Sequence, residues 1–118
     1  MKSSSKPNKK RAQYVVKDPY VYFFKAMSSK TRIEIIRVLG SGPMCVGEIH
    51  RSLGFKQSRV SRNLECLARC GFVKSRRSGK QMIYSLNDET IRPIIELIDV
   101  HMKKYCDYME SCPARKRR

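Results

Sequence analysis

The sequence predicts a single, mainly α-helical domain that carries one β-hairpin. Three observations support this fold class. Five segments have apolar residues spaced three and four apart, a glycine-containing turn closely joins two of these segments, and strand-forming residues lie on both sides of one glycine loop. With 118 residues and 41% hydrophobic content, the chain can form one core. We expect this domain over residues 14–110, between a disordered basic arm at 1–13 and a basic tail at 111–118.

The first two helices are predicted at the start of this domain. Asp18 followed by Pro19 is a typical helix start, because aspartate accepts hydrogen bonds from the first turn and proline suits the first helical position. We expect this helix over residues 18–28. A second helix is expected over 29–39, and it ends at the glycine-rich stretch that begins with Gly40.

The next two helices form a predicted helix-turn-helix. We expect them over residues 45–53 and 56–70, separated by a tight turn at Gly54. In the second of these helices, one apolar stripe leaves the polar residues of the N-terminal half on other faces. These polar residues are Gln57, Ser58, Arg59, Ser61 and Arg62.

A basic hairpin and a long helix complete the domain. Residues 72–86 are predicted to form the hairpin, with a three-residue loop, Ser78-Gly79-Lys80, between its strands. A basic hairpin directly after a helix-turn-helix is a wing, so the fold is predicted to be a winged helix-turn-helix. The last helix, over 90–110, has an apolar face longer than so small a domain can cover, which predicts a homodimer.

The charge of the chain indicates a polyanionic partner. There are 26 lysines and arginines against 10 aspartates and glutamates, a formal net charge of +16. Residues 51–80 hold nine basic residues and one acid, a local charge of +8, while both tails are also basic. The positive charge of the folded part is therefore concentrated on the helix-turn-helix and the wing.

These features predict binding to double-stranded DNA. A helix fits the major groove, where arginine pairs with guanine and glutamine with adenine, while serine and wing cations reach phosphates. We expect the groove to be contacted by Gln57, Ser58, Arg59, Ser61 and Arg62. The backbone beside the groove would be contacted by Arg76, Arg77 and Lys80.

The order of elements and three stretches of sequence resemble the ArsR/SmtB family of bacterial and archaeal repressors. The stretches are KAMSSKTRIEIIRVL, CVGEI and QSRVSRNLECLARCGFVKSRRSGKQMIYSL, and the resemblance covers about residues 20–106. It implies a homodimer that binds an inverted-repeat operator and represses its own operon. It also implies release from DNA when a metal, metalloid or thiol-modifying signal binds.

Two ligand sites of the family are incomplete here. The arsenic-sensing type has a CVC motif and a third cysteine at the start of the third helix, where this chain has Cys45, Gly47 and His50. One cysteine is too few for trivalent arsenic or antimony, which favour several sulfurs. At the positions of the zinc-sensing type, this chain has Asp88, Thr90, His101 and Lys104, so only two of four ligands remain.

We therefore expect the inducer to bind other cysteines. Cys45, with Cys106 and Cys112 from the partner chain, would form a three-sulfur pocket across the dimer interface. The expected inducer is trivalent arsenic or antimony, or a soft divalent metal, and no permanently bound cofactor is expected. Cys66 and Cys70 are interpreted as small structural residues, because cysteine packs well among apolar side chains.

Two other functions stay open. The first is a repressor that senses oxidants or reactive sulfur through two thiols, since nearby lysines and arginines raise thiol reactivity. The second is an architectural DNA-binding protein without a sensing function. An enzyme is not expected, because the sequence has no phosphate loop or paired-carboxylate site. We expect no contact with membranes and a cytoplasmic location, since apolar runs are short and no signal segment is apparent.

Overall fold

Five helices and three strands follow one another in the part of the chain that the computed structural model describes. This part comprises residues 18–111, with side chains described for 18–105. The elements are α2 (Pro19–Met27), α3 (Lys30–Leu39), β1 (Met44–Cys45), α4 (Val46–Leu53), α5 (Gln57–Arg69), β2 (Val73–Ser78), β3 (Gln81–Leu86) and α6 (Ile91–Ser111). The five predicted helices and the hairpin are confirmed.

Side-chain caps begin the first two helices as the sequence predicts. The Asp18 carboxylate accepts a 2.9 Å hydrogen bond from the backbone N–H of Tyr20, and Pro19 is the first residue of α2. The Ser29 hydroxyl accepts a 3.2 Å hydrogen bond from the backbone N–H of Arg32 and begins α3. Polar side chains thus satisfy N–H groups that have no partner within a helix.

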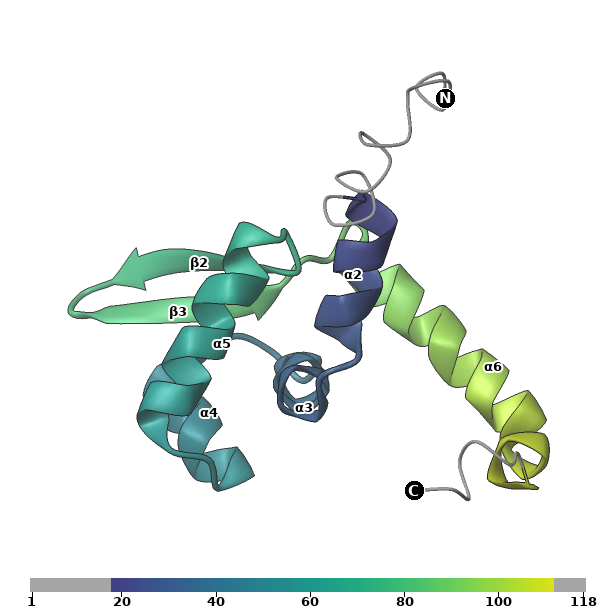
Figure 1. Cartoon of the computed structure of the whole chain (residues 1–118). Coiled ribbons are helices and arrows are strands. Elements are labelled where there is room, and N and C mark those ends of the chain that lie inside the picture. The colour runs from purple at the N-terminus through teal and green to yellow at the C-terminus, as the bar shows by residue number, and fades with distance from the viewer. Residues whose placement is uncertain (1–17, 112–118) are drawn as a thin grey trace, which may run out of the picture.

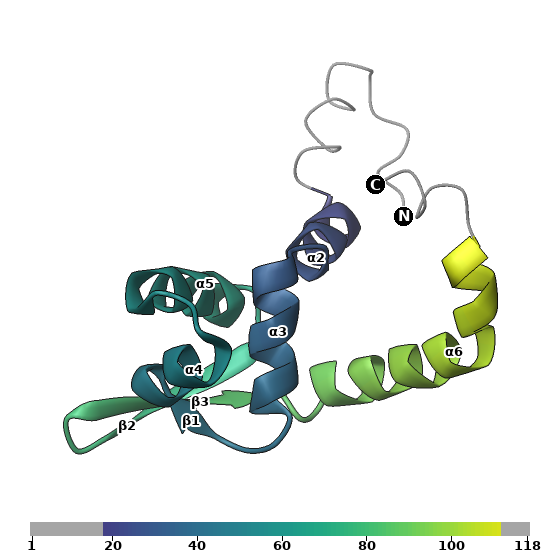
Figure 2. The ribbon, with the colours of Figure 1, turned by 90° about the horizontal axis from the view of Figure 1, so that it is seen from below.

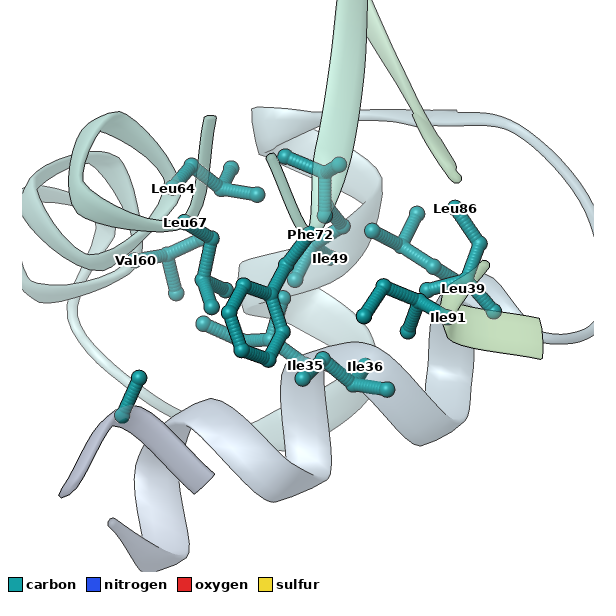
Figure 3. Packing of buried hydrophobic residues seen from close by; sticks show 12 residues of the cluster. Ile35, Ile36, Leu39, Ile49, Val60, Leu64, Leu67, Phe72, Leu86 and Ile91 are labelled. Atoms are coloured by element: carbon teal, nitrogen blue, oxygen red, sulfur yellow. The ribbon is translucent and has the colours of Figure 1, made fainter. Parts of the chain in front are cut away.

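The core lies where α3, α4 and α5 meet the base of the hairpin and the start of α6. Figure 3 shows the apolar side chains of these elements pointing toward one another around the ring of Phe72. The stripe predicted for α5 is fully buried, and the core is completed by residues of the other elements. The labelled core residues are Ile35, Ile36, Leu39, Ile49, Val60, Leu64, Leu67, Phe72, Leu86 and Ile91.

The turn between α4 and α5 has a left-handed glycine. Gly54 has a φ of 78°, and its N–H donates a 2.8 Å hydrogen bond to the carbonyl of His50. The Nδ1 atom of His50 lies 3.2 Å from the carbonyl oxygen of Phe55, which also closes this turn. His50 thus helps to hold the turn between α4 and α5.

The hairpin belongs to a three-stranded antiparallel sheet with the order β1-β3-β2. Ser78 pairs with Gln81, so the loop has two residues, Gly79 and Lys80, and the predicted three-residue loop is wrong. The strand pairing continues one residue further because Gly79 adopts a φ of 65°. The short strand β1 was not predicted, since two residues are too few to give an alternating pattern.

The wing and α6 project from opposite sides of the core (Figures 1 and 2). Asn87 shapes the turn that precedes α6. Its backbone and side-chain oxygens accept hydrogen bonds from the N–H groups that follow, and its side-chain amide donates to the carbonyl of Gly71 at 2.8 Å. The helix is interrupted at Tyr105, which has a φ of −117° and a ψ of 20°. No helix in residues 18–111 is long and apolar enough to cross a membrane.

Candidate nucleic-acid interface

The N-terminal half of α5 presents a polar surface. Gln57, Ser58, Arg59, Ser61 and Arg62 are all exposed, while Val60 between them is fully buried. This division follows from the helical period, because the buried stripe of α5 leaves the remaining positions to solvent. The helix therefore has the amide, hydroxyl and guanidinium groups that read base edges and phosphates.

Arg59 differs from Arg62 in its contacts. One terminal nitrogen of Arg59 donates a 2.7 Å hydrogen bond to the hydroxyl of Thr31, and the guanidinium carbon lies 4.3 Å from the centre of the Phe55 ring. The Arg62 guanidinium, in contrast, forms no hydrogen bond or ion pair with any of the residues whose side chains are described. Arg59 thus fixes α5 against α3, whereas Arg62 keeps its donors for a ligand.

Asn63 adds a second link between α3 and α5. Its side-chain oxygen accepts a 3.1 Å hydrogen bond from Nε of Arg32, and its side-chain nitrogen donates a 2.8 Å hydrogen bond to the carbonyl of Arg59. Together with the contact between Arg59 and Thr31, these bonds restrain the orientation of α5. A restrained helix presents its groove-facing side chains at low entropic cost.

A polar hollow of about 370 Å³ lies between the start of α5 and the turn of the wing. Gln57 lines it from α5, Lys80 and Gln81 from the wing, and Cys45 and Arg51 from α4 and its start. Arg51 and Lys80 give this hollow a positive charge. The hollow thus connects Gln57, the first residue of α5, with the turn of the wing.

The two wing arginines are exposed, but they lie on different faces of the hairpin. Arg76 pairs with Ile83 and Arg77 pairs with Met82 in β3. Side chains of consecutive strand residues point to opposite faces, so one nucleic-acid backbone along one face meets one of the two arginines. We therefore expect Arg76 and Arg77 to contribute unequally to the binding of nucleic acid.

The three cysteines predicted to bind an inducer are only partly described. Cys45 is half-buried at the start of α4, where its N–H donates a 3.0 Å hydrogen bond to the carboxylate of Glu48. Cys106 lies within α6, but its side chain is outside the described residues, and so is all of Cys112. A site formed by these three cysteines stays a prediction.

Cys66 and Cys70 form a pair of neighbouring thiols at the C-terminal end of α5. The N–H of Cys70 donates a 3.0 Å hydrogen bond to the carbonyl of Cys66, which places the residues one helical turn apart. Partial burial raises the pKa of the Cys70 thiol above its ordinary value. The Cys66 thiol, with its charge and its hydrogen bond to Cys70, raises this pKa further, while Arg32 and Arg69 oppose the shift.

The interpretation of this pair as buried structural residues does not fit Cys70. Cys66 is half-buried, but Cys70 is exposed. The signal in the sequence was the spacing of four on a predicted helix, which brings two side chains to the same face. Among the side chains that the structure describes, no three histidines, cysteines or acidic residues gather closely enough to hold a metal ion.

A sequence model of a regulatory family matches the central part of the chain. Residues 29–75 match the family described as "Bacterial regulatory protein, arsR family". This range contains α3, α4, α5 and the first part of β2, and thus the whole helix-turn-helix. The match therefore includes all of α5, the helix with the exposed polar residues.

Two curated proteins have similar sequences over most of the domain. A probable mercury resistance operon repressor of Streptomyces lividans is 34% identical over 80 residues, which are 68% of this chain and 64% of that protein. A cadmium resistance transcriptional regulatory protein CadC homolog of Staphylococcus aureus is 33% identical over 82 residues, which are 69% of this chain and 68% of that protein.

A solved structure has the same fold. The homodimeric winged helix-turn-helix DNA-binding domain Mb0332 of Mycobacterium bovis, a possible ArsR-family transcriptional regulator, superimposes with a TM-score of 0.70 at 25% identity. The match covers 79% of this chain and 86% of that one. The predicted winged-helix fold is therefore confirmed.

Proposed function

Because the chain belongs to the ArsR family of bacterial regulatory proteins, we propose that it is a transcriptional repressor that binds double-stranded DNA through α5 and the wing. The main support is the exposed polar surface of α5, which joins the wing turn at a positively charged hollow. Of the five residues predicted to face the major groove, Gln57, Ser58, Ser61 and Arg62 would contact it directly. The fifth, Arg59, would mainly hold α5 against Thr31. Such a protein would act in the cytoplasm, where its DNA is, and would have no enzymatic activity.

We propose that the repressor is a homodimer that binds an inverted repeat. Apolar side chains are exposed on α2 and along α6, including Phe24 at 62% and Leu97 at 69% of their full exposure. A face of this kind is stable in water when a second copy covers it. The two α5 helices of such a dimer, its recognition helices, would contact two half-sites about one turn of DNA apart.

The proposed inducer is trivalent arsenic, trivalent antimony or a soft divalent metal. The two curated relatives are named for resistance to mercury and to cadmium, which are both soft metals that thiolates bind well. The ligands we propose are Cys45 of one chain with Cys106 and Cys112 of its partner. Inducer binding would favour a dimer whose recognition helices no longer match the spacing of the half-sites.

The experiment is the release of a labelled operator fragment, followed by fluorescence anisotropy. Fragments from the DNA upstream of the gene would be tested with reduced protein, and arsenite, antimonite, zinc and cadmium would be titrated in parallel. We expect one or more of these ions to release the DNA. Replacing any one of Cys45, Cys106 and Cys112 by serine should abolish release, and undiminished release by all three variants would contradict this ligand set.

A redox-sensing repressor is the second candidate, and the placement of Cys66 and Cys70 one helical turn apart favours it. An oxidant such as hydrogen peroxide would take one hydrogen atom from each thiol and become water while a disulfide forms. A disulfide across one helical turn would distort the end of α5. Release of DNA by peroxide, reversed by a reductant and absent in Cys66→Ser, would favour this candidate over a metal sensor.

A further inference from the structure

An apolar pocket of about 530 Å³ lies between the start of α2 and the C-terminal end of α5. Its lining residues come from α2, from the end of α5 and from the segment that enters β2, namely Pro19, Tyr22, Phe23, Arg69, Cys70 and Phe72. Three of these side chains are aromatic, and one carries a permanent positive charge. This size and composition are typical of a site for a small organic molecule.

The aromatic wall of the pocket is held in place by contacts between rings. The ring of Phe23 stacks on that of Phe72, with centres 5.1 Å apart and planes 28° from parallel. It also meets the ring of Phe24 edge to face, with centres 5.2 Å apart. Phe72 is buried in the core, whereas Tyr22 is exposed and lies on the solvent side. An apolar ring that enters the pocket therefore meets a preformed wall and loses contact with water.

The pocket also has a positive charge without a partner. The Arg69 guanidinium forms no hydrogen bond or ion pair with any residue whose side chain the structure describes, including Glu65 one helical turn before it. The carboxylate of Asp18 caps α2 by accepting a hydrogen bond from the N–H of Tyr20, and it does not line the pocket. The donors of Arg69 are thus left for an anionic ligand.

The thiol of Cys70 responds to this positive charge. Partial burial raises the pKa of Cys70 above its ordinary value, and the Cys66 thiol raises it further. The positive charges of Arg32 and Arg69 act in the opposite direction. Two guanidinium groups therefore act on one wall of the pocket, where they attract an anion. The Cys70 thiol itself is neutral at neutral pH and does not repel one.

We propose that this pocket binds a small aromatic carboxylate. The ring would lie against Tyr22 and Phe23, and the carboxylate would accept hydrogen bonds from the guanidinium of Arg69. A guanidinium has parallel N–H donors that match the two oxygens of a carboxylate. A ring suits the preformed wall better than an alkyl chain does, because a rigid group loses less conformational entropy on binding. The ligand forms no bond to sulfur, unlike the inducer proposed above.

Occupation of the pocket would connect α2 with the recognition helix α5. Helix α2 carries part of the exposed apolar face that is proposed for the dimer, and α5 carries the groove-facing residues. A ligand between them would favour one arrangement of the two helices and so change the affinity for the operator. This effect rests on the proposed function, whereas binding of the carboxylate does not.

The test uses the full, reduced chain without DNA and 2-naphthoate as the probe. Isothermal titration calorimetry at neutral pH would compare it with 2-naphthamide, which has the same rings and no charge. We expect 2-naphthoate to bind with a Kd of about 0.1 mM, which is ordinary for a ligand of this size. We expect the amide to bind about fivefold more weakly, a modest difference because Arg69 is exposed.

Alkylation would locate the bound probe. Saturating 2-naphthoate should slow the reaction of Cys70 with iodoacetamide about threefold or more, because the probe covers the thiol and its charge disfavours the thiolate. Peptide mass spectrometry would follow the reaction. Cys45, which lines the hollow beside the wing, is the internal control and should react at an unchanged rate.

Three variants separate the charge from the aromatic wall. Arg69→Gln should bind 2-naphthamide within about twofold of the wild type but lose the preference for the carboxylate. Lys25→Gln removes one positive charge from an exposed position on α2 and should keep that preference. Tyr22→Ala should weaken the binding of both compounds, because it removes part of the wall.

Three results would overturn the proposal: no binding of 2-naphthoate to the wild type, a carboxylate preference that survives Arg69→Gln, or protection of Cys45 in place of Cys70. A pocket that a second copy covers would give the first result, together with a weaker dimer for Tyr22→Ala.

Discussion

Residues of the same type on α5 differ in their contacts, although the sequence alone does not distinguish them. Arg59 and Arg62 are both exposed arginines in the same helix, yet only Arg59 contacts Thr31 and Phe55. The exposure of these arginines could be predicted from the spacing of Val60 and Leu64. The partners of Arg59 could not, because Thr31 is 28 residues away and the contact depends on how α3 packs against α5.

The first prediction concerns how much Arg59 and Arg62 each contribute to the free energy of unfolding. Arg59→Ala should lower the free energy of unfolding by about 1–2 kcal/mol, because a buried hydroxyl loses its partner and Phe55 loses a cation. Arg62→Ala is the matched control and should change it by less than about 0.5 kcal/mol. Urea unfolding at one protein concentration measures both. Equal effects would contradict the role assigned to Arg59.

The second prediction concerns the Cys70 thiol. Its pKa is raised, so the thiol stays protonated to a higher pH than an ordinary cysteine, and reactive thiolate appears only as the pH rises further. In a variant with Cys45, Cys106 and Cys112 replaced by serine, alkylation of Cys70 by iodoacetamide should be slow at neutral pH. Adding Cys66→Ser should move its pH profile toward lower pH. A profile unaffected by Cys66 would be inconsistent with the coupling of these thiols.

At the scale of elements, periodicity predicted the helices well and the strand pairing less well. Helices α2 to α6 begin and end within one or two residues of the expected positions, because caps and glycines mark their ends. The wing loop was predicted one residue too long and β1 was missed, since their limits depend on pairing between strands. An apolar pocket beside Cys70 also escaped prediction, because residues from α2, the end of α5 and Phe72 form it together.

The third prediction concerns the turn of the helix-turn-helix. Gly54→Ala should destabilise the protein by about 1 kcal/mol, because a φ of 78° strains any residue with a Cβ atom although there is room for one. Gly54→Asn should cost less, since asparagine tolerates this conformation best after glycine. Thermal unfolding of the two variants provides the comparison. An alanine variant as stable as the wild type would be contrary to the prediction.

At the scale of the whole molecule, the exposed apolar side chains indicate that the single chain is one part of a larger assembly. The first turns of α6 contact the core through Ile91, and Arg37 forms a 2.9 Å ion pair with Asp99. Beyond this contact, α6 extends away from the rest of the domain (Figure 2) and leaves its apolar residues exposed. A homodimer is the assembly that both the helix and the homodimeric neighbour support.

The fourth prediction concerns this assembly. Leu97→Asp should shift the protein from dimer to monomer by placing a charge on the face that the partner covers. Ser41→Asp adds the same charge to an exposed loop and should leave the dimer intact. Sedimentation velocity over a range of concentrations distinguishes the two forms. A Leu97→Asp dimer as stable as the wild-type dimer would place the interface elsewhere.

The most direct test of the central claim is whether α5 reads DNA sequence. Anisotropy titrations at fixed salt would compare an upstream operator fragment with a scrambled fragment of equal length, for the wild type and Arg62→Ala. We predict that the wild type binds the operator at least about 1,000-fold more tightly, and that Arg62→Ala loses about 1–3 kcal/mol on the operator but much less on the scrambled fragment. Equal affinity of the wild type for both fragments would contradict the account.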